Sequence, residues 1–289
     1  MNWSIAITEG VSVGRRGKAS IWFLLVLWGV SPHLLARPLT VAFYYGKHPA
    51  VRELADFDLV VVDPDSDFTP VHYPRSRARW IAYVSVGEVT PNRGYYDLFP
   101  KSWILGDDPD WNSEIIDQTS PAWPAYFAEQ VVRPLWNRGY RGFFLDTLDS
   151  WRKVVTDPQE QERQQLGLVR LIVTLHRKFP QAQIVLNRGF ELLPKVHSLV
   201  NAVVVESVFQ GWNQKDKIYY AVSAQDTQWL LGQIDAIRRQ YRLPVIVLDY
   251  CDPQNPDCAL QDVSALRRAG VIPYVSDGLL QVINPLTLR

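Results

Sequence analysis

The sequence has no excess of charge of either sign. Its 30 Lys and Arg residues are balanced by 30 Asp and Glu residues, so the formal net charge is +0 at pH 7. Proteins that bind nucleic acids or anionic lipid surfaces usually carry a basic excess or a basic patch. We therefore expect no nucleic-acid partner, and membrane contact only through the apolar N-terminal segment.

Several enzyme motifs are also missing. The sequence contains no HExxH zinc-protease motif, no GxGxxG dinucleotide fingerprint and no GxxxxGK[ST] phosphate-binding loop. The five histidines are scattered and do not predict a Ser-His-Asp triad; they are His33, His48, His72, His176 and His197. These absences argue against metalloprotease, nucleotide-dependent and serine-hydrolase chemistry, and we predict no cofactor and no metal.

Cysteine is scarce. The two cysteines, Cys251 and Cys258, enclose the turn-rich stretch CDPQNPDC. A metal site at this spacing would need a second group of ligands, which the sequence does not offer. In an oxidising compartment the pair could form a disulfide worth roughly 2 to 3 kcal/mol in the chain-entropy model. The disulfide is favoured, with the metal site as the weaker alternative.

The N-terminus has the organisation of an export signal. Arg15, Arg16 and Lys18 precede an uncharged run from Ile21 to Val30, and Ala36 provides a small residue before a cleavage point. The run is shorter than the roughly 20 residues that span a bilayer. We predict a signal peptide over residues 1–36, with a retained N-terminal anchor as the alternative, and a periplasmic or secreted protein.

Apolar runs of strand length are plentiful and alternate with helical patterns. Most runs are continuously apolar, as in parallel strands that are covered on both faces. They span residues 39–45, 58–63, 80–87, 142–146, 183–187, 201–207, 244–250 and 271–276. Helical periodicity is clearest over 121–138, 159–179 and 223–241, and shorter helices are expected near 49–56, 191–199 and 260–269. The alternation predicts a single (β/α)8 TIM barrel over residues 37–289, with its weakest helix between strands two and three.

Polar or ionisable residues stand at nearly every predicted strand end. Active sites of such barrels form at the carboxyl ends of the strands. A strand ends where polarity begins, so a single acid there carries little information. Carboxylates at five of eight ends instead predict an acidic, aromatic-lined bowl. The candidates are Tyr44, Asp63, Glu88, Asp146, Asn187, Glu206, Asp249 and Tyr250.

Asp146 and Glu206 are the best pair for catalysis. Glycosidases use two carboxyl groups about 5 to 5.5 Å apart for retention or roughly 6.5 to 9.5 Å apart for inversion. Asp146 follows a buried strand directly and suits a nucleophile. Valines precede Glu206 and should raise its pKa by desolvation, as a general acid requires. Asp149 could order a loop, cap a helix or bind a sugar.

Seven motifs occur in an order that resembles glycoside hydrolase families 114 and 166. They are AFYYG, FDLVVVDPD, AYVSVGEV, GFFLDTLDS, LNRGFELL, VVVESVF and LPVIVLDY, and the resemblance spans residues 39 to 285. It implies a retaining endo-hydrolase of α-1,4-linked galactosamine or N-acetylgalactosamine polymers in biofilm matrices, such as the Pel exopolysaccharide. It also implies catalysis by Asp146 and Glu206. Tyr44, Asp63, Glu88, Asn187 and Tyr250 match positions that line the sugar site.

Two alternatives compete with this interpretation. The barrel could bind polysaccharide without cleaving it, during export or matrix assembly. It could also cleave another substrate class, although the chitinase-type DxxDxDxE run is missing. Relatives of the Pel system continue into a deacetylase domain, whereas this sequence stops shortly after its eighth predicted strand. We therefore expect a stand-alone hydrolase that acts as a monomer on a galactosamine-rich polysaccharide.

Overall fold

The computed structural model describes residues 38–288. The predicted signal peptide or anchor, residues 1–36, lies outside the described residues. Among the described residues, no helix is long and apolar enough to cross a bilayer.

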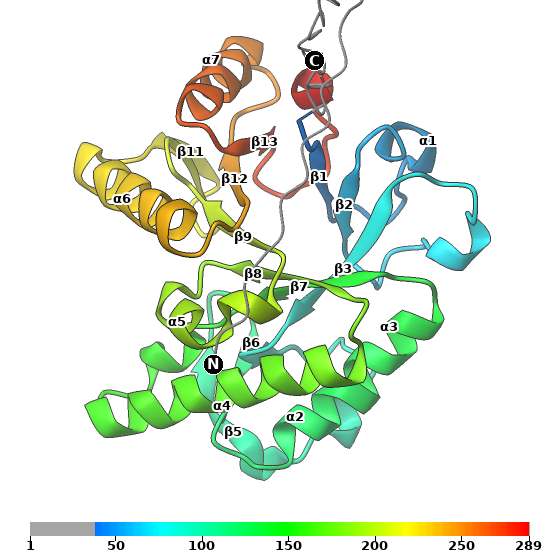
Figure 1. Cartoon of the computed structure of the whole chain (residues 1–289), viewed down its shortest axis with the longest axis vertical. Helices are drawn as coiled ribbons and strands as arrows, with labels where there is room; N and C mark the ends of the chain where they lie inside the picture. Colours follow the sequence, from blue (N-terminus) through cyan, green and yellow to red (C-terminus); the bar gives the residue numbers. More distant parts are fainter. Residues whose placement is uncertain (1–37, 289) are drawn as a thin grey trace, which may run out of the picture. The chain divides into compact units, whose positions relative to one another are not determined.

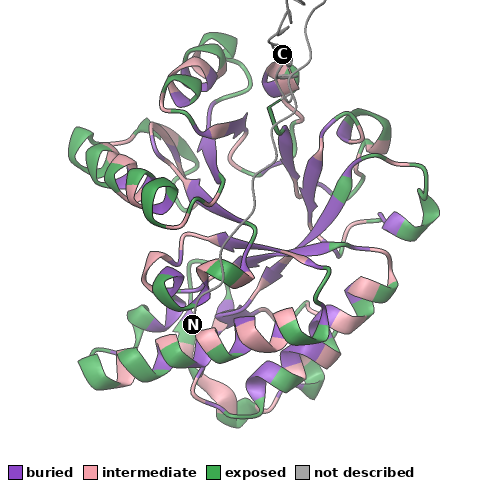
Figure 2. Cartoon of the chain, in the orientation of Figure 1, coloured by how far each residue is buried: buried purple, intermediate pink, exposed green. Residues whose placement is uncertain are grey.

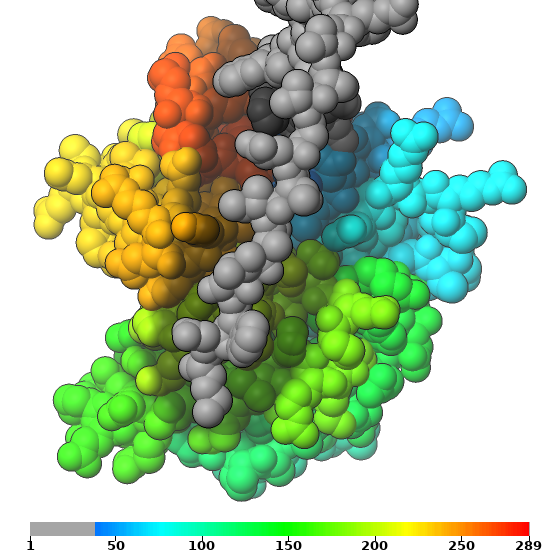
Figure 3. Space-filling model, in the orientation of Figure 1, coloured from blue at the N-terminus to red at the C-terminus, as the bar shows by residue number. Residues whose placement is uncertain are grey.

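Eight parallel strands form a nearly closed barrel, which confirms the predicted (β/α)8 fold (Figure 1). In order around the sheet they are β1 (Val41–Tyr44), β2 (Leu59–Val62), β3 (Arg79–Ser85), β7 (Gly142–Asp146), β8 (Gln183–Asn187), β9 (Ala202–Glu206), β12 (Val245–Tyr250) and β13 (Ile272–Ser276). All eight coincide with predicted apolar runs. The space-filling view shows the chain passing around the molecule in sequence order, from blue through green to orange (Figure 3).

The strands are apolar between their ends because packed side chains fill the barrel and helices cover much of its outer face. Val60, Val204 and Val247 are completely buried, and the strands are coloured as buried almost throughout (Figure 2). Across the seam between β1 and β13, the rings of Phe43 and Tyr274 lie 5.8 Å apart. Beside it the Tyr45 amide donates a 2.7 Å hydrogen bond to the Leu280 carbonyl. Side-chain packing therefore completes the ring where strand pairing stops.

The long helices begin at residues whose side chains cap them. Asp157 caps α4 (Pro158–Lys178), Ser223 caps α6 (Ala224–Gln240) and Asn255 caps α7 (Pro256–Arg268), each accepting a backbone N–H with its side chain. The predicted helix over 121–138 consists of α2 (Trp123–Tyr126), a π-helical stretch (Phe127–Val132) and α3 (Arg133–Asn137). Helices α1 (Val51–Leu54) and α5 (Leu193–Val196) are single turns. Between β2 and β3, where the weakest helix was expected, the described chain forms a short 3-10 helix, Pro70–His72.

Two small sheets were not expected from the sequence. A three-stranded antiparallel sheet follows β3 and consists of β4 (Glu88–Val89), β5 (Ile104–Asp108) and β6 (Ser113–Ile116). A hairpin of β10 (Gln210–Asn213) and β11 (Ile218–Ala221) follows β9. Both insertions leave the barrel at the carboxyl ends of its strands, so they extend the walls of any site formed there.

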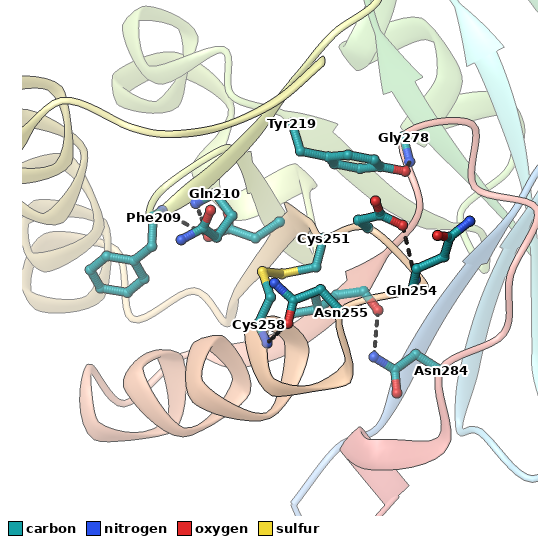
Figure 4. Close-up of a disulfide and its surroundings, with 12 residues drawn as sticks. Phe209, Gln210, Tyr219, Cys251, Gln254, Asn255, Cys258, Gly278 and Asn284 are labelled. Carbon is teal, nitrogen blue, oxygen red and sulfur yellow. Dashed lines mark hydrogen bonds between the residues drawn. A yellow bond between two sulfur atoms is a disulfide. The ribbon is translucent and has the colours of Figure 1, made fainter. Parts of the chain in front are cut away.

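Cys251 and Cys258 form a disulfide, which confirms the favoured prediction. It joins the residue after β12 to the first turn of α7, where the Asn255 side chain accepts a 3.2 Å hydrogen bond from the Cys258 amide (Figure 4). Within the described residues, no group of three or more His, Cys, Asp or Glu side chains could hold a metal ion.

Candidate active site

Three adjacent strands bring Asp146, Asn187 and Glu206 together, each from the last position of its strand. The Asn187 amide nitrogen donates one hydrogen bond to Asp146 Oδ1, at 2.7 Å, and another to Glu206 Oε1, at 2.6 Å. The opposite amide orientation would set its oxygen against two carboxylates. In this orientation the amide oxygen is buried and receives no donor from the described residues. Asn187 therefore uses both N–H groups of its side chain to hold the two carboxylates side by side.

The shared nitrogen limits how far apart the two acceptor oxygens can be. Because both oxygens bind the same nitrogen, Asp146 Oδ1 and Glu206 Oε1 lie at most about 5.3 Å apart. This distance between the two oxygens is shorter than the roughly 6.5 to 9.5 Å carboxyl spacing of inverting enzymes. Asp146 Oδ1 and Glu206 Oε1 are therefore close neighbours in the site.

The chain turns sharply after each of these three side chains. The next residue adopts a left-handed backbone conformation in every case, with φ of 61° at Thr147, 52° at Arg188 and 57° at Ser207. Residues other than glycine adopt it at a cost of about 1 to 3 kcal/mol, and such strain concentrates at functional sites. Hydrogen bonds hold these turns; for example, the Gly87 amide donates to Thr147 Oγ1 at 2.8 Å.

Two tyrosines, one half-buried and one buried, donate to the remaining carboxylate oxygens. The Tyr83 hydroxyl donates to Asp146 Oδ2 at 3.0 Å, and the Tyr250 hydroxyl donates to Glu206 Oε2. Burial and the neighbouring carboxylates raise the pKa of both phenols, so both stay protonated. The ring of Tyr45 lies 5.0 Å from that of Tyr83 and supports it. Each acid is thus oriented through both of its oxygens.

Glu206 has the electrostatics of a general acid. Burial raises its pKa above the ordinary value, and the adjacent charge of Asp146 raises it further. Hydrogen bonds from Tyr250 and Asn187 and the charge of Arg188 act in the opposite direction. A carboxyl group whose pKa is raised can hold a proton until a leaving group needs it.

The pair lies in a cleft of about 700 Å³ at the carboxyl ends of the strands. Its acidic lining residues outnumber its basic ones. The acidic lining residues are Asp63, Glu88, Asp146, Asp149 and Glu206, and the basic ones are Arg93, Lys153 and Arg188. A pocket for one small molecule would be more enclosed. This open, acidic and partly aromatic cleft suits a segment of a polymer.

Comparison with known proteins assigns the fold to a family. The family model for glycoside-hydrolase family GH114 matches residues 35–286. The chain belongs to this family. The GH114 chain is therefore a glycoside hydrolase, as the sequence motifs predicted.

Solved structures agree with the assignment. The glycoside hydrolase domain of PelA from Pseudomonas aeruginosa is 32% identical, with a TM-score of 0.77 over 84% of this chain and 96% of that chain. Ega3 from Aspergillus fumigatus, solved in complex with galactosamine, is 14% identical, with a TM-score of 0.60 over 84% of this chain and 91% of that chain. The second likeness concerns the fold alone. No curated protein matches the GH114 chain significantly.

The structure brings six of the eight predicted site residues into the cleft. They are Asp63, Glu88, Asp146, Asn187, Glu206 and Tyr250. Asp63 accepts a 3.1 Å hydrogen bond from Arg93 and contributes to the wall through that ion pair. Glu88 begins β4 instead of ending β3, and it is 5% exposed. Its carboxylate accepts hydrogen bonds from Ser113 and Ser150, which gives it a structural role in the wall of the cleft.

Tyr44 and Asp249 do not line the cleft, which corrects their prediction as sugar-contacting residues. The Tyr44 hydroxyl donates to the His48 carbonyl at 3.2 Å, and Tyr45 lines the cleft in its place. Asp249 is completely buried. It accepts hydrogen bonds from the amides of residues 208, 209 and 210, at 2.7, 2.7 and 3.0 Å. Asp249 therefore fixes the turn that follows Glu206.

Sequence reasoning missed several residues of the GH114 cleft: Tyr45, Tyr83, Arg93, Trp111 and Arg188. Tyr83 had a readable signal, because it is a hydroxyl-bearing residue inside an apolar strand. Arg93, Trp111 and Arg188 lie on turns whose course only the folded chain reveals, and Tyr45 follows directly after β1. Asp149 lines the cleft and makes no side-chain capping bond, so the capping role considered for it is not the one it takes.

The buried acids Asp249 and Asp262 predict that the free energy of unfolding depends on pH. Asp262 on α7 is 4% exposed, and neither of its carboxyl oxygens receives a donor from the described residues. Burial, followed by the charge of Asp249, raises the pKa of Asp262 from 3.8 to about 8. Folded Asp262 therefore keeps a proton that the unfolded chain releases near pH 4. Stability conferred by this proton falls as pH rises from about 4 to 8.

We expect Asp262→Asn to remove this component, because an amide can donate to Asp249 at any pH. Between pH 5 and 7.5 the free energy of unfolding of the wild type should fall, relative to the variant, by about 1.4 kcal/mol per pH unit. Urea unfolding at four pH values measures both slopes. Asp257→Asn, at an exposed position of α7, should keep the wild-type slope. Equal slopes for wild type and Asp262→Asn would contradict the proton assigned to folded Asp262.

Proposed function

We propose that the chain is an endo-acting, retaining hydrolase of α-1,4-linked galactosamine or N-acetylgalactosamine exopolysaccharide. Asp146 is the nucleophile and Glu206 is the acid/base. The observation that carries this proposal is the Asn187 bridge, which places an oxygen of each carboxylate within 2.7 Å of one nitrogen. Pure binding of a sugar has no need for two acids held so close, because their mutual repulsion is unfavourable.

In the first step, a carboxylate oxygen of Asp146 attacks the anomeric carbon while Glu206 transfers its proton to the departing glycosidic oxygen. The bond to that oxygen breaks as an ester to Asp146 forms. Tyr83 and Asn187 donate hydrogen bonds to Asp146 and so hold its carboxylate in a fixed orientation for attack. The raised pKa of Glu206 favours the protonated form that this step uses.

In the second step, Glu206, now ionised, removes a proton from water. The water oxygen attacks the anomeric carbon and Asp146 leaves as a carboxylate. Tyr250 donates to Glu206 throughout and holds the carboxyl group in one orientation for both transfers. Two inversions at the same carbon give net retention.

Three features support a galactosamine polymer as the substrate. The motifs of the sequence resemble hydrolases of such polymers, and Ega3, which shares the fold, was solved with galactosamine. The acidic lining also suits amino sugars that carry positive charge. We propose a periplasmic or secreted location and a monomer; the disulfide between Cys251 and Cys258 fits an oxidising compartment.

The test is incubation of the full chain with α-1,4-galactosamine oligosaccharides of defined acetylation. We expect internal cleavage, seen by mass spectrometry as products of several intermediate lengths, and ¹H NMR should show the α-anomer as the first product. A first-formed β-anomer would contradict retention. Intact oligosaccharides at every level of acetylation would contradict the substrate class.

A further inference from the structure

Trp111 is an exposed aromatic residue on the rim of the cleft. It lies in the turn between β5 and β6, its exposed fraction is 57%, and it lines the same cleft as the two acids. Within the described residues it has no aromatic ring partner. Trp229 is similarly exposed, at 53%, but it lies on α6 outside the cleft and packs against Phe190. An indole with a free face beside a polysaccharide cleft can stack on the apolar face of a sugar ring.

Both ends of the turn that carries Trp111 are anchored. Asp108, before the turn, accepts a hydrogen bond from Lys153, and Ser113, after it, donates to Glu88 at 2.6 Å. Both Asp108 and Glu88 are buried. Ser150 also donates to Glu88, so the segment after Asp149 is attached to the same buried carboxylate. Trp111 and the Asp149 segment are therefore held in a fixed relation.

Asp149 is an exposed carboxylate in the lining of this cleft. No side-chain hydrogen bond or ion pair to it occurs in the described part of the chain. The nearest cations along the chain are engaged elsewhere: Arg152 pairs with Glu191 at 3.1 Å, and Lys153 pairs with Asp108 and Glu88. The carboxylate thus remains available to a cationic ligand.

We propose that Trp111 and Asp149 form a rim subsite that binds a protonated, deacetylated hexosamine of the polymer. The indole stacks on the sugar ring and the carboxylate pairs with its ammonium group. An N-acetylated sugar presents a neutral amide at the same atom and forms no ion pair. This inference rests on the proposed function for the polymer, and it adds which residues select deacetylated units.

Binding in a catalytically silenced background tests the subsite independently of cleavage. The Glu206→Gln chain is titrated with fully deacetylated and fully N-acetylated galactosamine oligomers by calorimetry. Adding Trp111→Ala should weaken both affinities about tenfold. Adding Asp149→Asn should weaken the affinity for the deacetylated oligomer about fivefold, and more at low salt. The affinity for the acetylated oligomer should stay the same, so the protein's preference for the deacetylated oligomer becomes smaller.

Matched controls come from the same protein. Trp229→Ala removes an equally exposed indole outside the cleft, and Asp110→Asn removes an exposed carboxylate from the same turn as Trp111. Both should leave the two affinities unchanged. The inference is overturned when Trp111→Ala or Asp149→Asn binds like its control, or when Asp149→Asn weakens both oligomers equally. A wild type that binds with this preference but cleaves nothing would refute the proposed hydrolysis and leave the subsite standing.

Discussion

Replacement of Glu206 by Gln or of Asp146 by Asn should each lower kcat on galactosamine oligomers by about 10³-fold or more. Glutamine cannot transfer a proton to the leaving oxygen, and asparagine is a far weaker nucleophile than a carboxylate. Both amides can still accept the hydrogen bonds that Tyr250 and Tyr83 donate, so the fold should persist. Steady-state kinetics with thermal unfolding as a fold check measures both effects. Glu53→Gln, an exposed change on α1, is the control.

The two variants should differ when the leaving group needs no proton. With a galactosaminyl fluoride, formation of the ester should recover in Glu206→Gln, because fluoride departs without acid assistance. Asp146→Asn should not recover, since the attacking oxygen itself is lost. Equal recovery in both variants, or kcat within tenfold of wild type in either, would contradict the assigned roles.

Replacement of Asn187 by Ala is expected to lower kcat by about 10²-fold, an effect typical of losing one oriented donor at a reacting group. The change removes the nitrogen that bridges Asp146 and Glu206 and leaves two carboxyl groups free to turn apart. It should also move the pH profile. The Asn187 hydrogen bond lowers the pKa of Glu206, so its loss raises that pKa.

The direction of the shift follows from the role of Glu206 as acid. Activity falls when pH rises above the pKa of Glu206, because the proton is then absent. In Asn187→Ala this alkaline limb of kcat/KM should therefore lie at higher pH than in the wild type. A limb that stays in place, or moves to lower pH, would show that Asn187 does not act on Glu206. Asn213→Ala, outside the cleft, provides the unchanged profile for comparison.

The barrel and the meeting of Asp146 with Glu206 could be predicted because continuous apolar runs reveal buried parallel strands, and strand ends converge at one rim. Asp146, Asn187 and Glu206 occupy the last position of their strands, so their meeting follows from strand order alone. What the sequence could not give is the direction of each side chain. Successive residues of a strand point to opposite faces. Tyr45 therefore reaches the cleft while Tyr44 does not.

The same alternation explains Asp249, which points away from the cleft while Tyr250 beside it contacts Glu206. The inserted sheet of β4, β5 and β6 escaped prediction because its strands are short and mix polar with apolar residues. The left-handed residues after Asp146 and Glu206 are Thr147 and Ser207, so no glycine or asparagine marked these two turns; the turn at Arg188 is followed by Gly189. Tertiary contacts, and not local propensity, hold these parts of the site.

The most direct measurement of the central claim is mass spectrometry of the Glu206→Gln chain after reaction with α-galactosaminyl fluoride. Without the base that activates water, the ester should accumulate. We predict one added hexosaminyl group per chain, carried by Asp146 in the peptide map. Turnover without an adduct, or an adduct on any other residue, would contradict Asp146 as the nucleophile of this site.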